Sequence, residues 1–137
     1  KARVILQSSV YETAEAGSPS LATPRGPLTQ VLELQTDSDP AKLLTFLGHC
    51  QDALAGPKSG TFGQKKVGLE ILFYGSRSEK SPGLIIPHPQ SHTRMDVLSA
   101  MLELYPEFIH PTQKRTVRWL LTYLPKTAGQ AKPFKRR

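Results

Sequence analysis

The chain has 137 residues, a net charge of +7 and 38% hydrophobic residues. This length suits one domain with a single core, and the grouping of the apolar residues excludes a disordered chain. No apolar run approaches the roughly 20 residues of a membrane-spanning helix, and the single cysteine, Cys50, excludes an internal disulfide. A lone cysteine in an apolar stretch is typical of a reducing compartment. We therefore expect an intracellular protein of the cytoplasm, nucleus, an organelle matrix or a virion interior.

The charge is distributed unevenly along the chain. Residues 1–107 contain ten Lys or Arg and eleven Asp or Glu, whereas residues 108–137 contain eight Lys or Arg and no acid. This asymmetry predicts a neutral folded body with a strongly basic end. We expect a single domain over residues 1–125 and a basic tail over residues 126–137.

The first half of the chain predicts two strands and a helix. Regularly spaced apolar residues indicate strands over 3–11 and 28–36, separated by a loop rich in Gly, Ser and Pro. A helix follows over residues 41–54, where the apolar residues lie on one stripe. Asp39 suits the N-cap of this helix and Pro40 its first position.

The second half predicts two strands followed by two helices. The segment 67–75 is apolar on both faces, which is typical of a strand in the middle of a sheet, and 83–87 is a short fourth strand. A capping-box pattern at Thr93 opens a helix that ends before Pro106, and a further helix spans about 112–124. The element order predicts an α+β fold, with a four-stranded sheet, one packed helix and a C-terminal helical pair.

Candidate catalytic and metal-ligating residues are few. His49 and Cys50 are neighbours on a predicted helix and point in different directions, so no nucleophilic pair is expected. His88 and His92 are four residues apart, but in a loop rather than on one helix face, and we interpret them as exposed loop histidines. Glu70 interrupts an apolar strand, which an edge-facing or paired carboxylate explains. Because the carboxylates are dispersed, we predict no enzyme, no cofactor and no metal site.

The loop GPKSGTFGQKK combines glycines with lysines. Free backbone N–H groups and lysine charges are the elements of a phosphate-binding loop. The loop precedes a predicted strand, however, whereas a Walker motif opens a helix. We therefore predict only a secondary anion-binding loop, formed by Lys58, Lys65 and Lys66.

The basic end carries the main functional hypothesis. Aromatic residues flank a basic face of the last predicted helix, and the tail continues the charge, a pattern suited to neutralising phosphates and stacking on bases. The alternatives are a solvated helix face, an acidic protein partner or anionic lipid. We predict a non-enzymatic structural or binding protein that contacts RNA or a ribonucleoprotein. The expected contact residues are Lys114, Arg115, Arg118, Trp119, Lys126, Lys132, Lys135, Arg136 and Arg137.

The run LTQVLELQTDSDPAKLLTFLGHCQDALAG, followed by KKVGLEILFYG, resembles the strand–helix–strand core of rhabdovirus-type matrix proteins. The resemblance implies a basic, non-enzymatic protein that self-associates and binds anionic membrane and nucleocapsid. This is the alternative function to RNA binding.

Overall fold

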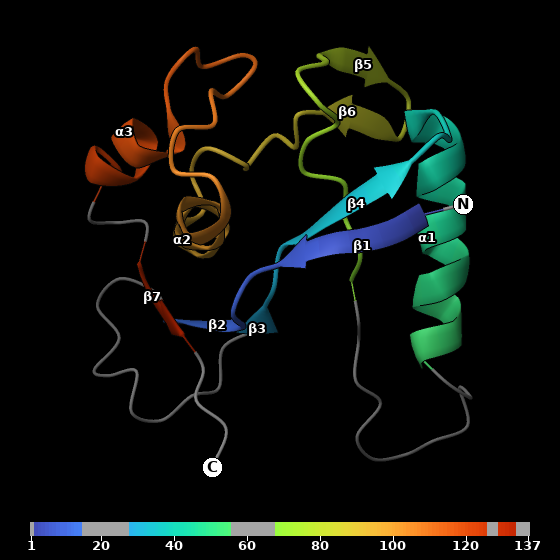
Figure 1. The fold of residues 1–137 in the computed structure, drawn as a ribbon, viewed down its shortest axis with the longest axis horizontal. Coiled ribbons are helices and arrows are strands. Elements are labelled where there is room, and N and C mark those ends of the chain that lie inside the picture. The colour runs from blue at the N-terminus through green and yellow to red at the C-terminus, as the bar shows by residue number, and fades with distance from the viewer. Residues whose placement is uncertain (1, 15–27, 56–67, 126–128, 134–137) are drawn as a thin grey trace.

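The computed structural model describes residues 2–14, 28–55, 68–125 and 129–133. Strands and helices are mixed along the chain, and the strands form small antiparallel sheets, so the predicted α+β class is confirmed (Figure 1). The sheets are smaller than expected, with two, three and two strands in place of one sheet of four. None of the described helices is long and apolar enough to cross a bilayer.

Two of the sheets are built mainly from the N-terminal half, and one of them includes a strand from the C-terminal end. Strand β1 (Ala2–Gln7) pairs antiparallel with β4 (Leu32–Thr36). Strand β2 (Tyr11–Ala14) lies between β3 (Leu28–Thr29) and β7 (Gln130–Pro133). Strand β7 belongs to the part of the chain predicted to be a tail, and its pairing with β2 brings it onto the folded body. The division at residue 125 stays a prediction.

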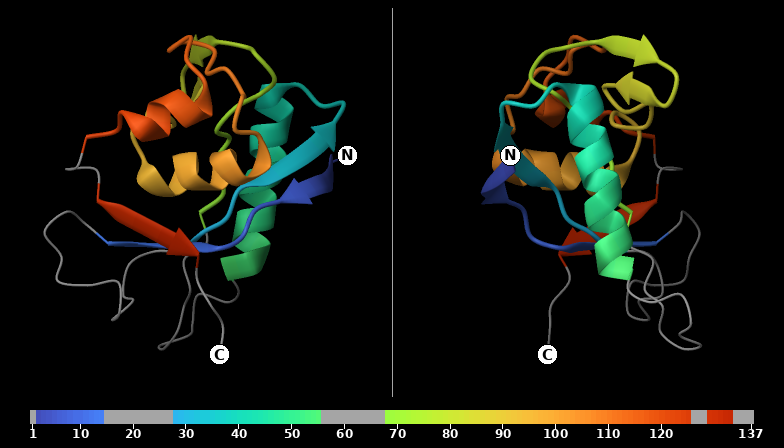
Figure 2. Two further views of the ribbon diagram at one scale, coloured as in Figure 1. Left: turned by 60° about the vertical axis from the view of Figure 1, so that its left-hand side comes forward. Right: turned by 90° about the vertical axis from the view of Figure 1, so that its right-hand side faces the viewer.

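Helix α1 (Pro40–Ala55) matches its prediction closely. The Oδ1 atom of Asp39 accepts a hydrogen bond from the backbone N–H of Lys42 at 2.9 Å, which is the geometry of an N-cap. Helix α1 stands at one end of the β1–β4 ribbon in Figure 1, where β1 begins and β4 ends, and Figure 2 shows it along one side of the molecule. Local capping chemistry therefore set the beginning of this helix, as expected.

The last third contains a hairpin and two helices. Strands β5 (Glu79–Ser81) and β6 (Leu84–Ile86) form the hairpin, and α2 (Met95–Leu104) and α3 (Val117–Thr122) pack on each other. Helix α3 is half the length expected for residues 112–124. It begins at Thr116, whose hydroxyl accepts a hydrogen bond from the backbone N–H of Trp119, so a local N-cap ends the preceding loop there.

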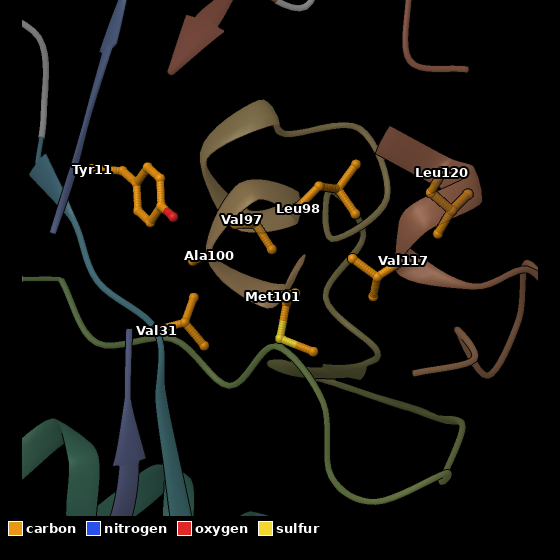
Figure 3. Packing of buried hydrophobic residues seen from close by; sticks show 8 residues of the cluster. All are labelled: Tyr11, Val31, Val97, Leu98, Ala100, Met101, Val117 and Leu120. Atoms are coloured by element: carbon orange, nitrogen blue, oxygen red, sulfur yellow. The ribbon is translucent and has the colours of Figure 1, made fainter. Parts of the chain in front are cut away.

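The core lies around α2, which contributes four of its buried side chains (Figure 3). Val97, Leu98 and Ala100 are at most 1% exposed. The other members come from β2, the residue before β4, the C-terminal part of α2 and α3: Tyr11, Val31, Met101, Val117 and Leu120. Residues 68–74, predicted to form a central strand, carry no strand pairing in the structure; Leu72 and Phe73 pack against this core from one side.

Candidate functional site

A cluster of opposite charges lies where three non-helical segments meet. The Glu70 carboxylate contacts the His88 ring, with 3.3 Å between Oε2 and Nε2, and the Arg94 guanidinium, with 3.4 Å between Oε1 and Nη1. Glu70 lies on the extended segment 68–75, His88 follows β6, and Arg94 immediately precedes α2. The three side chains thus form one group, although His88 and Arg94 are 18 and 24 positions away from Glu70 in the sequence.

Asp96 anchors Arg94 from the side of α2. Its Oδ2 atom accepts hydrogen bonds from Arg94 Nη2 at 2.8 Å and from the Thr29 hydroxyl at 2.6 Å. Its Oδ1 atom accepts from Arg94 Nε at 3.2 Å and from the Val97 backbone N–H at 2.9 Å. The two carboxylate oxygens therefore hold the guanidinium as a fork, a geometry that fixes its plane as well as its charge.

This arrangement keeps both partners charged. Burial alone would raise the pKa of Asp96, but the hydrogen bonds from Arg94, Thr29 and Val97 outweigh it and leave that pKa below its ordinary value. The hydrogen bond to Asp96 likewise raises the pKa of Arg94, despite an opposing effect of burial. Arg94 therefore stays positively charged, and the negatively charged Asp96 carboxylate holds it in place.

The backbone orients His88 as well. Its N–H donates to the Leu72 carbonyl at 2.8 Å, which ties the His88 loop to the segment that carries Glu70. Its ring Nδ1 accepts a hydrogen bond from the Gln90 N–H at 3.1 Å. In the neutral ring the proton is therefore on Nε2, which faces Glu70. His88 presents a donor to the same space as Arg94.

The prediction of two exposed loop histidines is wrong. The His88 side chain is 19% exposed and paired with Glu70, and His92 is half-buried, with its ring 5.4 Å from that of His110. The loop folds back on the core, so the two rings reach different partners. Nothing in the periodicity of PHPQSH signals this, because both partners are distant in sequence.

His110 forms a second, fully buried group. Its Nδ1 accepts from the backbone N–H groups of Thr112 and Gln113, and its Nε2 lies 2.8 Å from the Ser91 hydroxyl. The neutral ring therefore donates to Ser91 through Nε2. Burial, with a smaller contribution from the charge of His92, lowers the pKa of His110 to about 4. The ring closes a turn and has no open face for a substrate.

Among the described residues, no group of three or more His, Cys, Asp or Glu side chains is placed to hold a metal ion. The other candidates of the sequence do not join the cluster either. His49 is exposed on α1, and Cys50 is a half-buried free thiol beside it. Lys58, Lys65 and Lys66 lie outside the described residues, so the anion-binding loop stays a prediction.

The basic end is partly neutralised by acids from other parts of the chain. Arg118 pairs with Glu107 at 2.8 Å, and Lys132 lies 3.6 Å from the buried carboxylate of Glu12. Arg115 stacks over the Trp119 ring, with 4.6 Å between the guanidinium carbon and the ring centroid. Lys114 is exposed. The remaining expected contact residues, Lys126, Lys135, Arg136 and Arg137, lie outside the described residues.

Comparison with known proteins gives a consistent result. A family model described as 7,8-dihydro-6-hydroxymethylpterin-pyrophosphokinase (HPPK) matches residues 1–106. The 2-amino-4-hydroxy-6-hydroxymethyldihydropteridine pyrophosphokinase of Synechocystis sp. is 28% identical over 121 residues, which cover 88% of this chain and 60% of the relative. The protein of the same name from Bacillus subtilis is 28% identical over 97 residues, 71% of this chain and 56% of the relative.

A further match is the folic acid synthesis protein fol1 of Pneumocystis carinii. It is 35% identical over 81 residues, 59% of this chain and 11% of the relative. The chain thus spans at most about 60% of the length of these three curated relatives.

These matches overturn the functional predictions made from the sequence. The prediction of a non-enzymatic structural protein is wrong, as are RNA, ribonucleoprotein and anionic membrane as partners and the matrix-type alternative. The physical reason is that charge was counted along the chain, whereas folding places Glu107 and Glu12 against the basic end. The family match covers most of the chain and ends before that basic end. The chain belongs to the 7,8-dihydro-6-hydroxymethylpterin-pyrophosphokinase family.

Proposed function

We propose that the Glu70–His88–Arg94 cluster binds the phosphate chain of a nucleoside triphosphate in a pyrophosphokinase reaction on a hydroxymethyl pterin. The observation that carries the proposal is the Arg94 fork, held on Asp96 and facing a half-exposed Glu70 beside a second donor, His88. The family name supplies the reaction type, and ATP is the donor expected for it.

The reaction moves a diphosphate group. The hydroxymethyl oxygen of the pterin attacks the β-phosphorus of ATP and forms a new P–O bond. The bond from that phosphorus to the oxygen bridging to the α-phosphate breaks, AMP leaves with the electron pair, and the hydroxyl proton passes to solvent. Protein catalysis of such a transfer depends mainly on positioning and on stabilising the phosphate charge.

Arg94 has the geometry for this task. Three of its five N–H groups are used by Asp96 and Glu70, which leaves two for phosphate oxygens. Its contact with Glu70 is long, at 3.4 Å, and Glu70 is 53% exposed, so an incoming phosphate can displace that carboxylate from Arg94. The shorter bonds to Asp96 keep the guanidinium in place meanwhile. His88 adds a donor from the other side.

A divalent cation is the expected companion of ATP, and Mg²⁺ binds through one or two carboxylates together with substrate phosphates. Asp96 is unsuited, because both of its oxygens already accept two hydrogen bonds. Glu70 fits as a single protein ligand, since each of its oxygens has one long contact. When bound, the ion would neutralise phosphate charge, and Arg94 and His88 would hold the oxygens that remain.

Nucleotide binding tests the proposal directly. We expect titration calorimetry with Mg²⁺ and α,β-methylene-ATP, in which the scissile bridge is replaced, to show saturable binding. Arg94→Lys should weaken it at least about tenfold, because a lysine cannot reproduce the fork. The matched control is Arg118→Lys, which alters an exposed arginine paired with Glu107 and should leave affinity unchanged. Equal affinities for both variants, or no binding by the unaltered chain, would refute the proposal.

Activity is a second readout. AMP release should require both ATP and 6-hydroxymethyl-7,8-dihydropterin. Because Arg94 also pairs with the buried Asp96, the melting temperature of Arg94→Lys is measured beside its affinity. If Arg94→Lys melts at the same temperature as the unaltered chain but binds the nucleotide tenfold more weakly, Arg94 has a role in binding and not only in stability.

The compartment and the domain division rest on fewer observations. We propose a reducing compartment, because Cys50 is the only cysteine of the chain and its thiol is free. A boundary near residue 125 is supported by the end of α3 at Thr122 and is opposed by the pairing of β7 with β2.

A further inference from the structure

The loop between β6 and α2, residues 87–94, carries two members of the charged cluster. His88 lies near its beginning and Arg94 at its end. The Arg94 side chain is anchored by the buried Asp96 carboxylate. His88 is held by backbone groups and by a contact of 3.3 Å to the exposed Glu70. The position of His88 therefore depends on whatever fixes the backbone of this loop.

Backbone hydrogen bonds fold the loop into two successive turns. The Ser91 N–H donates to the His88 carbonyl at 2.9 Å, and the Gln90 N–H donates to Nδ1 of the His88 ring at 3.1 Å. In the second turn, the Arg94 N–H donates to the Gln90 carbonyl at 3.2 Å. Gln90 and Ser91 together therefore have direct hydrogen bonds to both cluster members of the loop.

Ser91 fastens these turns to the protein interior. Its side chain is 0% exposed, whereas Gln90 beside it is exposed. The Ser91 hydroxyl oxygen lies 2.8 Å from Nε2 of His110, which donates to it. Removing either partner would leave a buried polar group unpaired, which makes this hydrogen bond a strong constraint on the loop.

His110 is a rigid partner for Ser91. Its side chain is 1% exposed, and its Nδ1 accepts from the backbone N–H groups of Thr112 and Gln113 at 3.3 and 3.2 Å. Its own backbone N–H donates to the Arg115 carbonyl at 2.9 Å. Because ring and backbone are both held, Nε2 points to one place, where the Ser91 hydroxyl lies.

The His110 ring also contacts the segment that carries Glu70. Phe73 packs edge-on against it, with 5.3 Å between the ring centroids and 83° between the planes. Phe73 and Glu70 both lie on residues 68–75. One buried ring thus touches both segments from which the cluster is built. His110 lies beyond residues 1–106, the part of the chain that the family model matches.

We propose that Ser91 and His110 are positioning residues, which hold the 87–94 loop so that His88 and Arg94 face the same phosphate-binding space. In this role neither residue touches the phosphate, and both act through the backbone of the loop. What the loop binds rests on the proposed function, whereas the placement of His88 is measured without any nucleotide.

Two substitutions at His110 separate its bond to Ser91 from its bonds within the turn. In His110→Asn, the amide oxygen takes the place of Nδ1 and still accepts from Thr112 and Gln113, but the side chain is too short to reach Ser91. In His110→Gln, the amide nitrogen takes the place of Nε2 and still donates to Ser91, whereas the turn loses its acceptor. Both variants lose the buried ring, so a general loss of stability affects both.

The first readout is the affinity for α,β-methylene-ATP with Mg²⁺, measured by titration calorimetry. We expect Ser91→Ala and His110→Asn to weaken binding about fivefold or more, and His110→Gln to stay within about twofold of the unaltered chain. Combining Ser91→Ala with His110→Asn should add little, because both changes break the same bond. The matched control is Ser8→Ala, which removes a hydroxyl that is 3% exposed and accepts from the Val31 N–H. It should lower the melting temperature without altering affinity.

The second readout is the tautomer of His88 without nucleotide, taken from the nitrogen chemical shifts of the neutral ring. In the unaltered chain the proton should be on Nε2, because Nδ1 accepts from Gln90. In Ser91→Ala and His110→Asn the turn loses its anchor, so we expect a mixture of both tautomers. His110→Gln should restore the Nε2 form.

Any one of four results would overturn the inference: unchanged affinity in Ser91→Ala and His110→Asn, equal losses in His110→Asn and His110→Gln, an equal loss in Ser8→Ala, or an unchanged His88 tautomer in Ser91→Ala. If the unaltered chain binds no nucleotide, the proposed function fails. The His88 tautomer then decides alone whether Ser91 and His110 position the loop.

Discussion

Replacing Asp96 by Asn tests the foundation of the charged cluster. Asparagine keeps the size of the side chain and an acceptor for Thr29, but it removes the charge that holds the Arg94 fork. Breaking a buried ion pair costs about 3–5 kcal/mol. Asp96 is 5% exposed, whereas the Arg94 side chain is 31% exposed and stays partly solvated after the change, so we expect a cost below this range, about 2–3 kcal/mol.

The unfolding free energy lost in Asp96→Asn should become smaller as the pH falls. The pKa of Asp96 is lowered in the folded protein from its ordinary value of 3.8. A depressed carboxyl pKa stabilises the fold above the pKa of the unfolded chain and loses this effect as pH falls through the folded value. The difference in unfolding free energy between the unaltered chain and Asp96→Asn should therefore be full at pH 6 and shrink below about pH 4.

Urea unfolding followed by circular dichroism, at a series of pH values, measures this difference. A shift in transition midpoint with an unchanged slope would show a change in stability alone. The matched control is Asp52→Asn, an exposed carboxylate on α1. Equal stability of Asp96→Asn and the unaltered chain at pH 6, or a difference that persists undiminished at pH 3, would refute the reasoning.

Three further predictions concern side chains outside the cluster. His110→Phe should destabilise the fold by about 2 kcal/mol at pH 7, because the buried Ser91 hydroxyl and the N–H groups of Thr112 and Gln113 lose their partner. The pKa of His110 is depressed to about 4, so its neutral ring stabilises the fold above pH 6.5, and the difference measured by urea unfolding should fall as pH drops from 6.5 to 4. Tyr11→Phe should cost about 1 kcal/mol and remove the phenol that titrates near pH 12 in ultraviolet absorbance, where burial and the hydrogen bond to Glu103 hold its pKa. Asp39→Ala should cost about 1 kcal/mol in thermal unfolding, whereas Asp52→Ala, without an N-cap role, should cost little.

The elements predicted well are those governed by neighbours in sequence. Asp39 and Pro40 define the beginning of α1 within a few residues, and the structure reproduces the predicted cap. The charged cluster has no such local signature. Glu70 stood out because it interrupts an apolar segment, but its partners come from loops 18 and 24 residues away. Periodicity reports which face a residue occupies and carries no information on which distant residue will meet it.

Asp96 shows a different limit of what a sequence pattern can predict. The sequence pattern assigned it to a capping box with Thr93, a motif satisfied by local backbone N–H groups. In the structure Arg94 is the N-cap residue of α2 and provides no side-chain cap, while Asp96 accepts from Arg94 and Thr29. Strand β3 brings Thr29 to this helix from 67 residues away. A charge-assisted pair of hydrogen bonds is stronger than a cap between neutral groups. Asp96 therefore pairs with Arg94 in place of the expected capping box with Thr93.

The cluster combines a rigid half with a less constrained half. Arg94 is held by both oxygens of Asp96, which is itself fixed by Thr29 and the first turn of α2. Glu70 lies instead on residues 68–74, which carry no strand pairing and are held by isolated hydrogen bonds, from His88 to Leu72 and from Leu69 to Gln51. Glu70 contributes its carboxylate at distances of 3.3 and 3.4 Å, so under the proposed function it is the member of the cluster that an incoming phosphate would displace.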